Sequence, residues 1–460
     1  MSNKQKTIFI VITRGALARN ILRCGVLGYI KKAGLNVVVL FLRHKLPLPQ
    51  QLRDEFEDSQ VQVEEVKDFY IRGHNLFSKI VDLLVYTDST RRFAIFNEMR
   101  WGRPSFWKYV EGMIFVPLSK IQFLKKLARY LERRIFSKEI YGELFNKHTP
   151  SVVLSTSIAS KADIQFMAEA ERRGIPTVSM PKGWDNVTKT LYSFVPDKLA
   201  VHNELMREAA VDIQRVKREN VVTVGFPQFD LYRKPEIIIN RENYCKQMGL
   251  DPSRKIIFFG SEGRWASSDE KIVLALAEAV GDGGIFAKTA SLIIRPHFTD
   301  IKERRFDKFE QFKNVIVDKT ITTSNFFMDN WDPGMEETKK FVNLLYHCDV
   351  LVTVASTLNL DAVCFDKPLI NINYGVLQHP KTGKDITPVL YMADHLQWVL
   401  DTGAVDLVSS DLELKNKIGE YLIDPSKKSK ERGLLLDSIC YKVDGNSSKR
   451  LADIVISYTK

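Results

Sequence analysis

The chain has 460 residues, of which 45% are hydrophobic and 27% charged, and its formal net charge is +11 at pH 7. This length suits two domains of roughly 200 residues each. No segment approaches the ~20 consecutive apolar residues of a membrane span, which argues against an integral membrane protein. The positive charge is compatible with nucleic acid, anionic lipid or phosphorylated substrates and does not choose among them.

Cysteine usage and the N-terminus indicate a reducing compartment. The five cysteines are odd in number and never occur in Cys-x-x-Cys spacing, so we expect neither a disulfide framework nor a zinc site. The apolar run at 7–12 is too short for a signal peptide and is typical of a buried strand. We therefore expect a cytoplasmic protein.

Short apolar runs alternate with amphipathic stretches along the chain. The runs in the first half are 7–12, 36–42, 151–157, 176–181, 198–203 and 220–227, and those in the second half are 255–261, 291–298, 314–319, 349–357 and 368–373. β-Branched runs separated by helices predict an α/β protein with two Rossmann-like, doubly wound parallel-sheet domains facing across a cleft. A polar passage near 230–250 separates the halves, so we divide the chain into 1–235 and 236–460. In such an arrangement the last helix can return to the first domain.

Ligands of open parallel sheets bind beyond the carboxyl ends of the strands. One such end is "VASTLNLD" (354–361), where Ser356 and Thr357 precede a helix that carries Asp361. A helix start attracts phosphate through its unpaired N–H groups, and an acid one turn inside can accept ribose hydroxyls. The alternative is that Ser356 is an ordinary helix cap and Asp361 a solvated acid.

Two further strand ends of the second half carry groups suited to phosphate. "RPHF" (295–298) offers the Arg295 fork and the His297 donor, held in an extended frame by the proline between them. "FFGSEGRW" (258–265) supplies Gly260, Ser261 and Arg264, although it matches neither a dinucleotide fingerprint nor a P-loop. Three such loops in one half favour a nucleotide diphosphate site more than any one of them does.

Two loops of the first half could line the opposite wall. The first is "TRGALARN" (13–20), and the second is "MPKGWDNVTKT" (180–190), with Lys182, Trp184, Asp185 and Asn186. We expect Trp184 to be exposed and to stack on a sugar, with Asp185 and Asn186 near its hydroxyls. The alternative is that Trp184 is buried as a plug between the domains.

Residues 106–136 contain a basic amphipathic pattern. From Ser119 on, apolar residues recur at helical spacing among many Lys and Arg, and Glu132 is the only acid. Such a helix can lie on the anionic inner face of the plasma membrane, as in a peripheral protein. The alternative, a core helix with a solvated basic face, is favoured somewhat more.

The order of these motifs resembles the GT-B superfamily of glycosyltransferases over most of residues 7–375. "VTVGFPQFDLY" (222–232), "LIIRPHF" (292–298) and "CDVLVTVASTLNLDAVCFDKPLININ" (348–373) follow in the order of that superfamily. The Arg-Pro-His tripeptide is similar to that of CDP-glycerol glycerophosphotransferases and related capsule or surface-polysaccharide transferases.

The resemblance implies transfer of a sugar from a UDP-, CDP-, GDP- or CMP-linked donor to a hydroxyl of a surface glycan, free or lipid-linked. It implies no bound metal and no permanent cofactor. The donor diphosphate would lie on Arg295, His297, Ser356 and Thr357, and its ribose on Asp361. An inverting reaction, weakly favoured, needs a general base from the first domain, and Asp185 is the first candidate and Asp163 the second.

Three other functions stay open. The chain can be a glycerophosphotransferase of the CDP-glycerol type, or a nucleotide-sugar 2-epimerase, although few histidines fall at strand ends. The weakest alternative is a non-catalytic binder of nucleic acid or a membrane surface, because the basic residues outside 106–136 are dispersed among acids.

Overall fold

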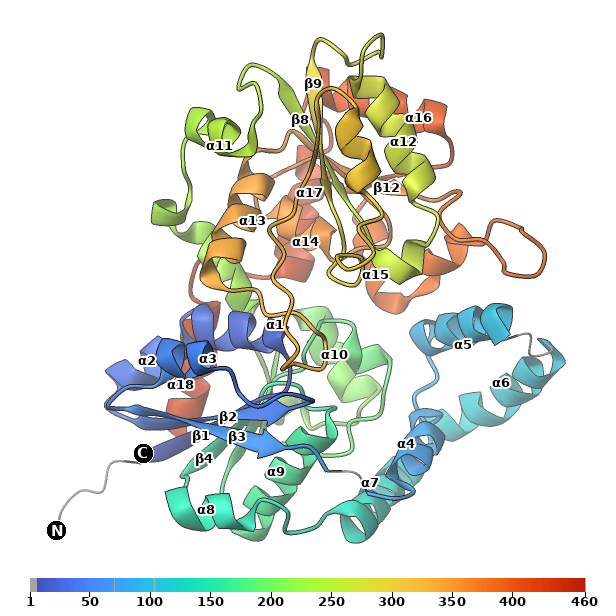
Figure 1. Ribbon diagram of the computed structural model, residues 1–460. Helices are drawn as coiled ribbons and strands as arrows, with labels where there is room; N and C mark the ends of the chain where they lie inside the picture. Colours follow the sequence, from blue (N-terminus) through green and yellow to red (C-terminus); the bar gives the residue numbers. More distant parts are fainter. Residues whose placement is uncertain (1–5, 70, 102–104, 460) are drawn as a thin grey trace.

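The computed structural model describes residues 6–69, 71–101 and 105–459, and within helices α5 and α6 it does not describe the side chains of 94, 96–101, 105–109 and 111. Two sheets dominate the molecule (Figure 1), and all their pairings are parallel. The α/β prediction with two Rossmann-like sheets is therefore confirmed.

The first sheet has the strand order β3-β2-β1-β4-β5-β6-β7. Its strands are β1 (Thr7–Ile12), β2 (Asn36–Arg43), β3 (Val61–Lys67), β4 (Val152–Ser155), β5 (Thr177–Ser179), β6 (Lys198–Val201) and β7 (Val221–Thr223). The helices around it are α1 (Gly15–Leu17), α2 (Val26–Lys32), α3 (Gln50–Phe56), α8 (Gly142–His148), α9 (Lys161–Arg172), α10 (Glu204–Asp212) and α18 (Ser447–Ser457). Strands β1, β2 and β4 are almost continuously buried, as expected for a sheet covered on both faces.

The second sheet has the order β10-β9-β8-β11-β12-β13. Its strands are β8 (Lys255–Gly260), β9 (Ala290–Arg295), β10 (Val315–Val317), β11 (Val350–Thr353), β12 (Leu369–Ile372) and β13 (Val405–Val408). Its helices are α11 (Arg241–Met248), α12 (Glu270–Val280), α13 (Met335–His347), α14 (Leu358–Val363), α15 (Asp394–Leu400), α16 (Asp411–Ile423) and α17 (Ser429–Leu435).

The C-terminal helix α18 packs in the first half of the molecule, close to the N-terminal strand (Figure 1). The N–H groups of Ser447 and Ser448 donate to the Asp230 carboxylate at 3.0 and 2.7 Å, and the Ser448 hydroxyl donates to the Cys24 carbonyl at 3.2 Å. The chain therefore passes from the first half to the second and returns at its C-terminus. The limits of the two domains, 1–235 and 236–460, remain a prediction.

Residues 320–334, here called the bridging loop, extend from the second sheet into the first half (Figure 1). Phe326 and Phe327 are buried in the core of the first sheet, where both rings lie against Phe41. A Cβ on Gly15 would lie 1.8 Å from the Trp331 carbonyl oxygen, so this close approach requires glycine. The bridging loop thus fixes the ends of the two sheets against each other.

Four helices form an arm that projects from the body (Figure 1). They are α4 (His74–Asp82), α5 (Asp88–Trp101), α6 (Ser105–Lys120) and α7 (Gln122–Phe136). The basic pattern predicted at 106–136 therefore spans two helices that break at Ile121, and its first side chains lie outside the described residues. No described helix has the length and apolar character needed to cross a membrane.

Candidate functional site

The ends of three neighbouring strands of the second sheet form one edge. Gly260, the last residue of β8, is in register with Arg295 at the end of β9 and with Thr353 at the end of β11. Because parallel strands end at the same edge, the loops that follow them lie side by side. The structure therefore brings together the three segments in which the sequence predicts a diphosphate site.

The loop after β8 is held by internal hydrogen bonds. The buried Ser261 hydroxyl donates to Asp269 at 2.8 Å and accepts from the Gly263 N–H at 3.0 Å and from Arg305 at 3.1 Å. Gly263 has a φ of +58°, and a Cβ there would lie within 3 Å of His297, so this glycine allows the loops after β8 and β9 to touch. Ser261 therefore shapes the loop, whereas Arg264 is exposed.

Arg295 is already paired within the protein. Its buried guanidinium forms ion pairs with Asp318 and, at 3.2 Å, with Glu337, and it lies 4.9 Å from the Phe341 ring centre. Burial acts to raise the pKa of Asp318, but the positive charge of Arg295 and the hydrogen bonds from Thr320 and Arg295 together lower it below its ordinary value. A diphosphate would have to compete with two carboxylates for this side chain.

His297 is half-buried at the end of the same segment. Its Nδ1 lies 2.7 Å from the Thr299 hydroxyl, and burial lowers the pKa of His297 to about 4. The imidazole is therefore neutral at pH 7 and can offer a hydrogen bond without a full charge.

The loop after β11 contains both a helix cap and an accessible hydroxyl. The Ser356 hydroxyl is buried and accepts from the Leu358 N–H at 3.1 Å, so Ser356, one residue before the N-cap Thr357, satisfies the first N–H of α14. Thr357 is exposed, and no side-chain cap bond is formed by it. Of the two hydroxyls predicted to contact phosphate, Thr357 is the one that a ligand can reach.

Asp361 is not a solvated acid. The Tyr232 hydroxyl, in the segment that closes the first half, donates a hydrogen bond to the Asp361 Oδ1. Burial raises the pKa of Asp361 to about 6, although this bond and the charge of Arg19 act in the opposite direction. Asp361 thus joins the two halves of the chain at the edge of the predicted nucleotide site.

The loop after β5 meets the second half. Trp184 is only 3% exposed and packs edge-on against His395, with 4.9 Å between the ring centres. The prediction of an exposed Trp184 is therefore wrong, because the two halves close over the ring and it forms the plug that was the alternative. Asp185, the next residue, forms an ion pair with Lys189.

The two acids predicted as general bases lie in different surroundings. Burial acts to raise the pKa of Asp185, but Lys189, His395 and Lys182 together lower it far below its ordinary value. Asp163 is fully buried at the start of α9, where its backbone N–H donates to the Ser160 hydroxyl, and burial raises its pKa to about 6. Asp163 exchanges hydrogen bonds with Ser160 at the start of its own helix, which favours a structural role.

Two charged residues at this edge were not predicted from the sequence. Glu262 follows Ser261, and burial raises its pKa to about 7, partly offset by a hydrogen bond with Ser356. Arg92 on α5 donates to the Leu390 carbonyl at 3.0 Å, and its charge acts on Glu262. The "SEGR" loop itself could have drawn attention to Glu262, whereas no pattern in the sequence brings Arg92 from the arm to this place.

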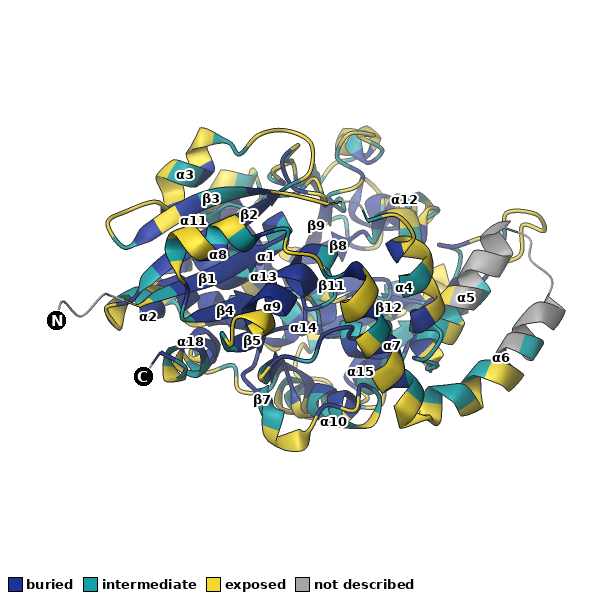
Figure 2. Cartoon of the chain, turned by 90° about the horizontal axis from the view of Figure 1, so that it is seen from below, coloured by how far each residue is buried: buried dark blue, intermediate teal, exposed yellow. Residues whose placement is uncertain are grey.

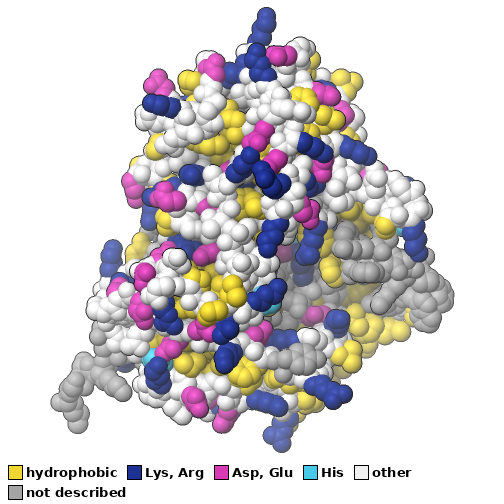
Figure 3. Space-filling view, in the orientation of Figure 1, with side chains coloured by type: hydrophobic (Ala, Val, Ile, Leu, Met, Phe, Trp, Pro, Cys, Tyr) yellow, Lys and Arg dark blue, Asp and Glu magenta, His cyan; other side chains and the backbone are white. Residues whose placement is uncertain are grey.

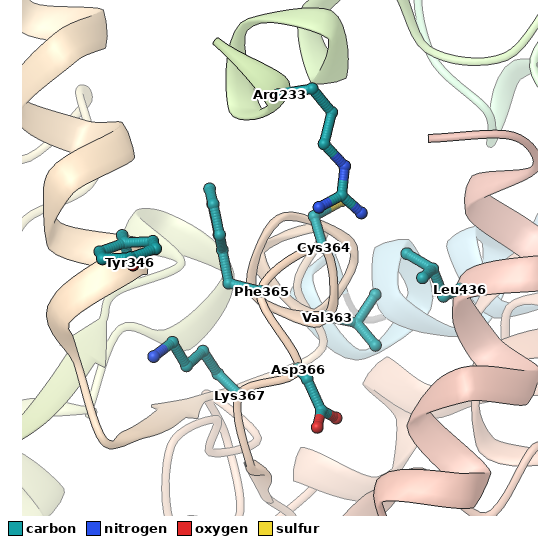
Figure 4. A pocket seen from close by; sticks show the side chains of 8 residues that line it. All are labelled: Arg233, Tyr346, Val363, Cys364, Phe365, Asp366, Lys367 and Leu436. Atoms are coloured by element: carbon teal, nitrogen blue, oxygen red, sulfur yellow. The ribbon is translucent and has the colours of Figure 1, made fainter. Parts of the chain in front are cut away.

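A cavity of about 570 Å³ lies at the opposite end of α14, lined by Arg233, Tyr346, Val363, Cys364, Phe365, Asp366, Lys367 and Leu436 (Figure 4). It shares no residue with the predicted diphosphate site. Within the described residues, no group of three or more His, Cys, Asp and Glu side chains is arranged to hold a metal ion.

Comparison with known proteins reveals similarity in fold alone. No protein-family model and no curated protein matches the sequence. Among solved structures, UDP-GlcNAc 2-epimerase from Neisseria meningitidis, bound to UDP-GlcNAc, matches 98% of this chain and 100% of its own with a TM-score of 0.57 and 12% identity. The S. aureus MnaA–UDP complex matches 99% of this chain and 97% of its own, with a TM-score of 0.55 and 12% identity.

A third match is the wall teichoic acid polymerase TagF with CDPG, which covers 98% of this chain and 88% of its own with a TM-score of 0.54 and 12% identity. All three matches extend over both sheets. The chain has the GT-B fold. Because GT-B proteins at this identity share architecture rather than activity, the reaction must be argued from the site.

Proposed function

We propose that this GT-B chain is a glycosyltransferase that moves a sugar from a nucleotide-activated donor to a hydroxyl of a surface glycan, lipid-linked or free. The observation that carries the proposal is the register of Gly260 with Arg295 and Thr353, which aligns three loops at one edge of the second sheet. Ligands of open parallel sheets bind at such an edge.

On the donor side, the accessible groups of these loops receive the diphosphate. Thr357 and Arg264 are exposed and His297 is half-buried, so these three side chains can contact phosphate oxygens without breaking an ion pair. Hydrogen-bond donors fixed at this place stabilise the negative charge that develops on the leaving nucleotide. Arg295, held by Asp318 and Glu337, contributes its charge from behind the loop rather than as an open fork.

Asp361 takes the ribose in this proposal. Tyr232 engages its Oδ1, which orients the carboxylate for hydrogen bonds to hydroxyl groups. The same bond couples the nucleotide site to the segment that closes the first half.

On the acceptor side, Asp185 remains the first candidate for the general base. It is ionised at neutral pH, but its lowered pKa makes it a weak proton acceptor. Transfer that relies on Asp185 therefore requires the acceptor to displace Lys189 or His395 from the carboxylate.

Phosphorus NMR of the protein incubated with UDP-GlcNAc, UDP-glucose and CDP-glycerol, with and without a glycan acceptor, tests the proposal. A glycosyltransferase releases a nucleoside diphosphate in an acceptor-dependent manner. Release of CMP from CDP-glycerol would instead indicate a glycerophosphotransferase. A 2-epimerase would leave the nucleotide linkage of UDP-GlcNAc intact while proton NMR detects a new sugar, and either of these two results would overturn the proposal.

A further inference from the structure

Helix α7 is turned with three of its charged residues toward the protein. Its buried residues are Lys125, Ala128, Arg129, Glu132 and Phe136. The Lys125 ammonium donates to the Ile213 carbonyl at 2.6 Å, and the Arg129 guanidinium donates to the carbonyls of Tyr192 and Gln214, both at 2.7 Å. Glu132 bonds to the buried His74 ring at 2.7 Å. These contacts pair the two buried cations and one oxygen of Glu132, and they fix the rotation of the helix.

Several apolar residues of α7 consequently face away from the body, while Ala128 and Phe136 are buried. Phe123 is 67% exposed, Tyr130 58% and Ile135 52%, and Ile121 and Leu127 are exposed as well. The exposed residues Met113, Ile114 and Val116 of α6 add to them. Figure 2 shows exposed positions along the outer side of both helices, and Figure 3 shows hydrophobic side chains at the lower edge of the arm. The alternative of a core helix whose apolar side is buried is therefore wrong for this segment.

The exposed charges on this surface have one sign. Lys120, Lys126, Arg133 and Arg134 are exposed, and among the side chains that the structure describes only Arg133 of these four has an acidic partner, Glu171 at 2.8 Å. Glu132, the only acid in residues 112–136, is buried. A symmetric dimer through this face would bring bases against bases without an acid to neutralise them.

We propose that this face, formed by residues 113–135 of α6 and α7, docks on a bilayer that contains anionic lipid. Exposed aromatic and aliphatic side chains enter the headgroup boundary, and the surrounding Lys and Arg pair with lipid phosphates. The inference goes beyond the proposed function, because it rests on the burial pattern of the arm and requires no particular reaction.

Flotation of the intact protein with vesicles tests this proposal. Vesicles of phosphatidylcholine alone and of phosphatidylcholine mixed with phosphatidylglycerol are compared at low and high salt. We expect binding to the mixed vesicles, weakened by salt, and a loss of about tenfold or more in the double variant Phe123→Ser/Tyr130→Ser. The double variant Lys120→Gln/Lys126→Gln should weaken binding to the mixed vesicles in the same direction.

The matched control is Leu412→Ser/Ile423→Ser on α16, where two apolar side chains are 71% and 87% exposed on the second half. It should bind vesicles as the unaltered protein does. The proposal is overturned if the unaltered protein does not float, or if the arm variants and the control bind equally. Formation of a dimer that the Phe123→Ser/Tyr130→Ser variant abolishes, with no vesicle binding, would overturn it in favour of self-association. Since these readouts involve no turnover, their failure is distinct from failure of the proposed reaction.

Discussion

At the scale of single residues, the hydrogen bond from Tyr232 to Asp361 joins segments 129 positions apart. Replacing Tyr232 by Phe leaves a half-buried carboxylate without this donor, so we expect a loss of about 1–3 kcal/mol in the free energy of unfolding. Urea denaturation measures it. Tyr130→Phe, at an exposed position of the arm, is the matched control, and an equal effect of both variants would contradict the structural role given to this bond.

Glu262 gives a prediction about pH. Its pKa is raised from 4.5 to about 7 in the folded protein, chiefly by burial. The folded state therefore holds this proton more tightly than the unfolded state, and the stabilisation is complete below pH 4.5 and is lost as the pH rises through 7.

The variant Glu262→Gln should lack this pH-dependent contribution. As pH rises over that range, the unaltered protein should lose stability that the variant keeps. The free energy of unfolding of the variant should therefore increase relative to that of the unaltered protein. Urea denaturation at several pH values follows it, with Glu278→Gln, on the second-half helix α12, as a control. A pH-independent difference would show that Glu262 titrates normally.

Several residues of the site could be predicted, but their partners could not. The strand-end positions of Ser356, Arg295 and His297 follow from the alternation of apolar runs and polar loops. The carboxylates that pair with Arg295, those of Asp318 and Glu337, lie 23 and 42 positions further along the chain. No spacing rule relates these positions to Arg295. The sequence therefore places groups at the edge of a sheet without telling which of them remain available to a ligand.

At the scale of elements, strands buried on both faces were the most predictable. The β-branched runs at 7–12 and 36–42 correspond to β1 and β2. The edge strand β3, "VQVEEVK", was missed because its exposed face breaks the apolar run. The rotation of α7 could not be inferred either, since the carbonyls that receive Lys125 and Arg129 belong to distant loops.

The bridging loop leads to a prediction about stability. Phe327 is fully buried in the core of the first sheet, although its segment comes from the second. Phe327→Ala should lower the free energy of unfolding by about 3–5 kcal/mol, because it leaves a cavity in that core.

The neighbouring residue Met328 is 40% exposed, and Met328→Ala should change stability little. Chemical denaturation of both variants measures the difference. If Phe327→Ala were as stable as Met328→Ala, the bridging loop would not be held in the core of the first half.

At the scale of the whole molecule, several contacts hold the two sheets together. Arg23 pairs with Asp332 of the bridging loop at 2.7 Å, and the Ser89 N–H at the start of α5 donates to Asp394 at 2.7 Å. Helix α18, which follows the second half in the chain, is tied to the first half by the bonds of its first residues to Asp230. The edge that carries the predicted nucleotide site therefore has a fixed opposite wall, which is the arrangement that transfer between two substrates requires.

We propose above all that a nucleotide binds at the edge formed by β8, β9 and β11. Calorimetric titration of UDP, CDP, GDP and CMP tests it most directly, with Asp361→Asn as the site variant. The control is Asp366→Asn at the other end of α14, beside the cavity, where the side chain is 57% exposed. We predict that one nucleotide binds selectively, about tenfold or more weaker in Asp361→Asn and unchanged in Asp366→Asn. Absence of binding by the folded protein, or a loss confined to Asp366→Asn, would contradict the account.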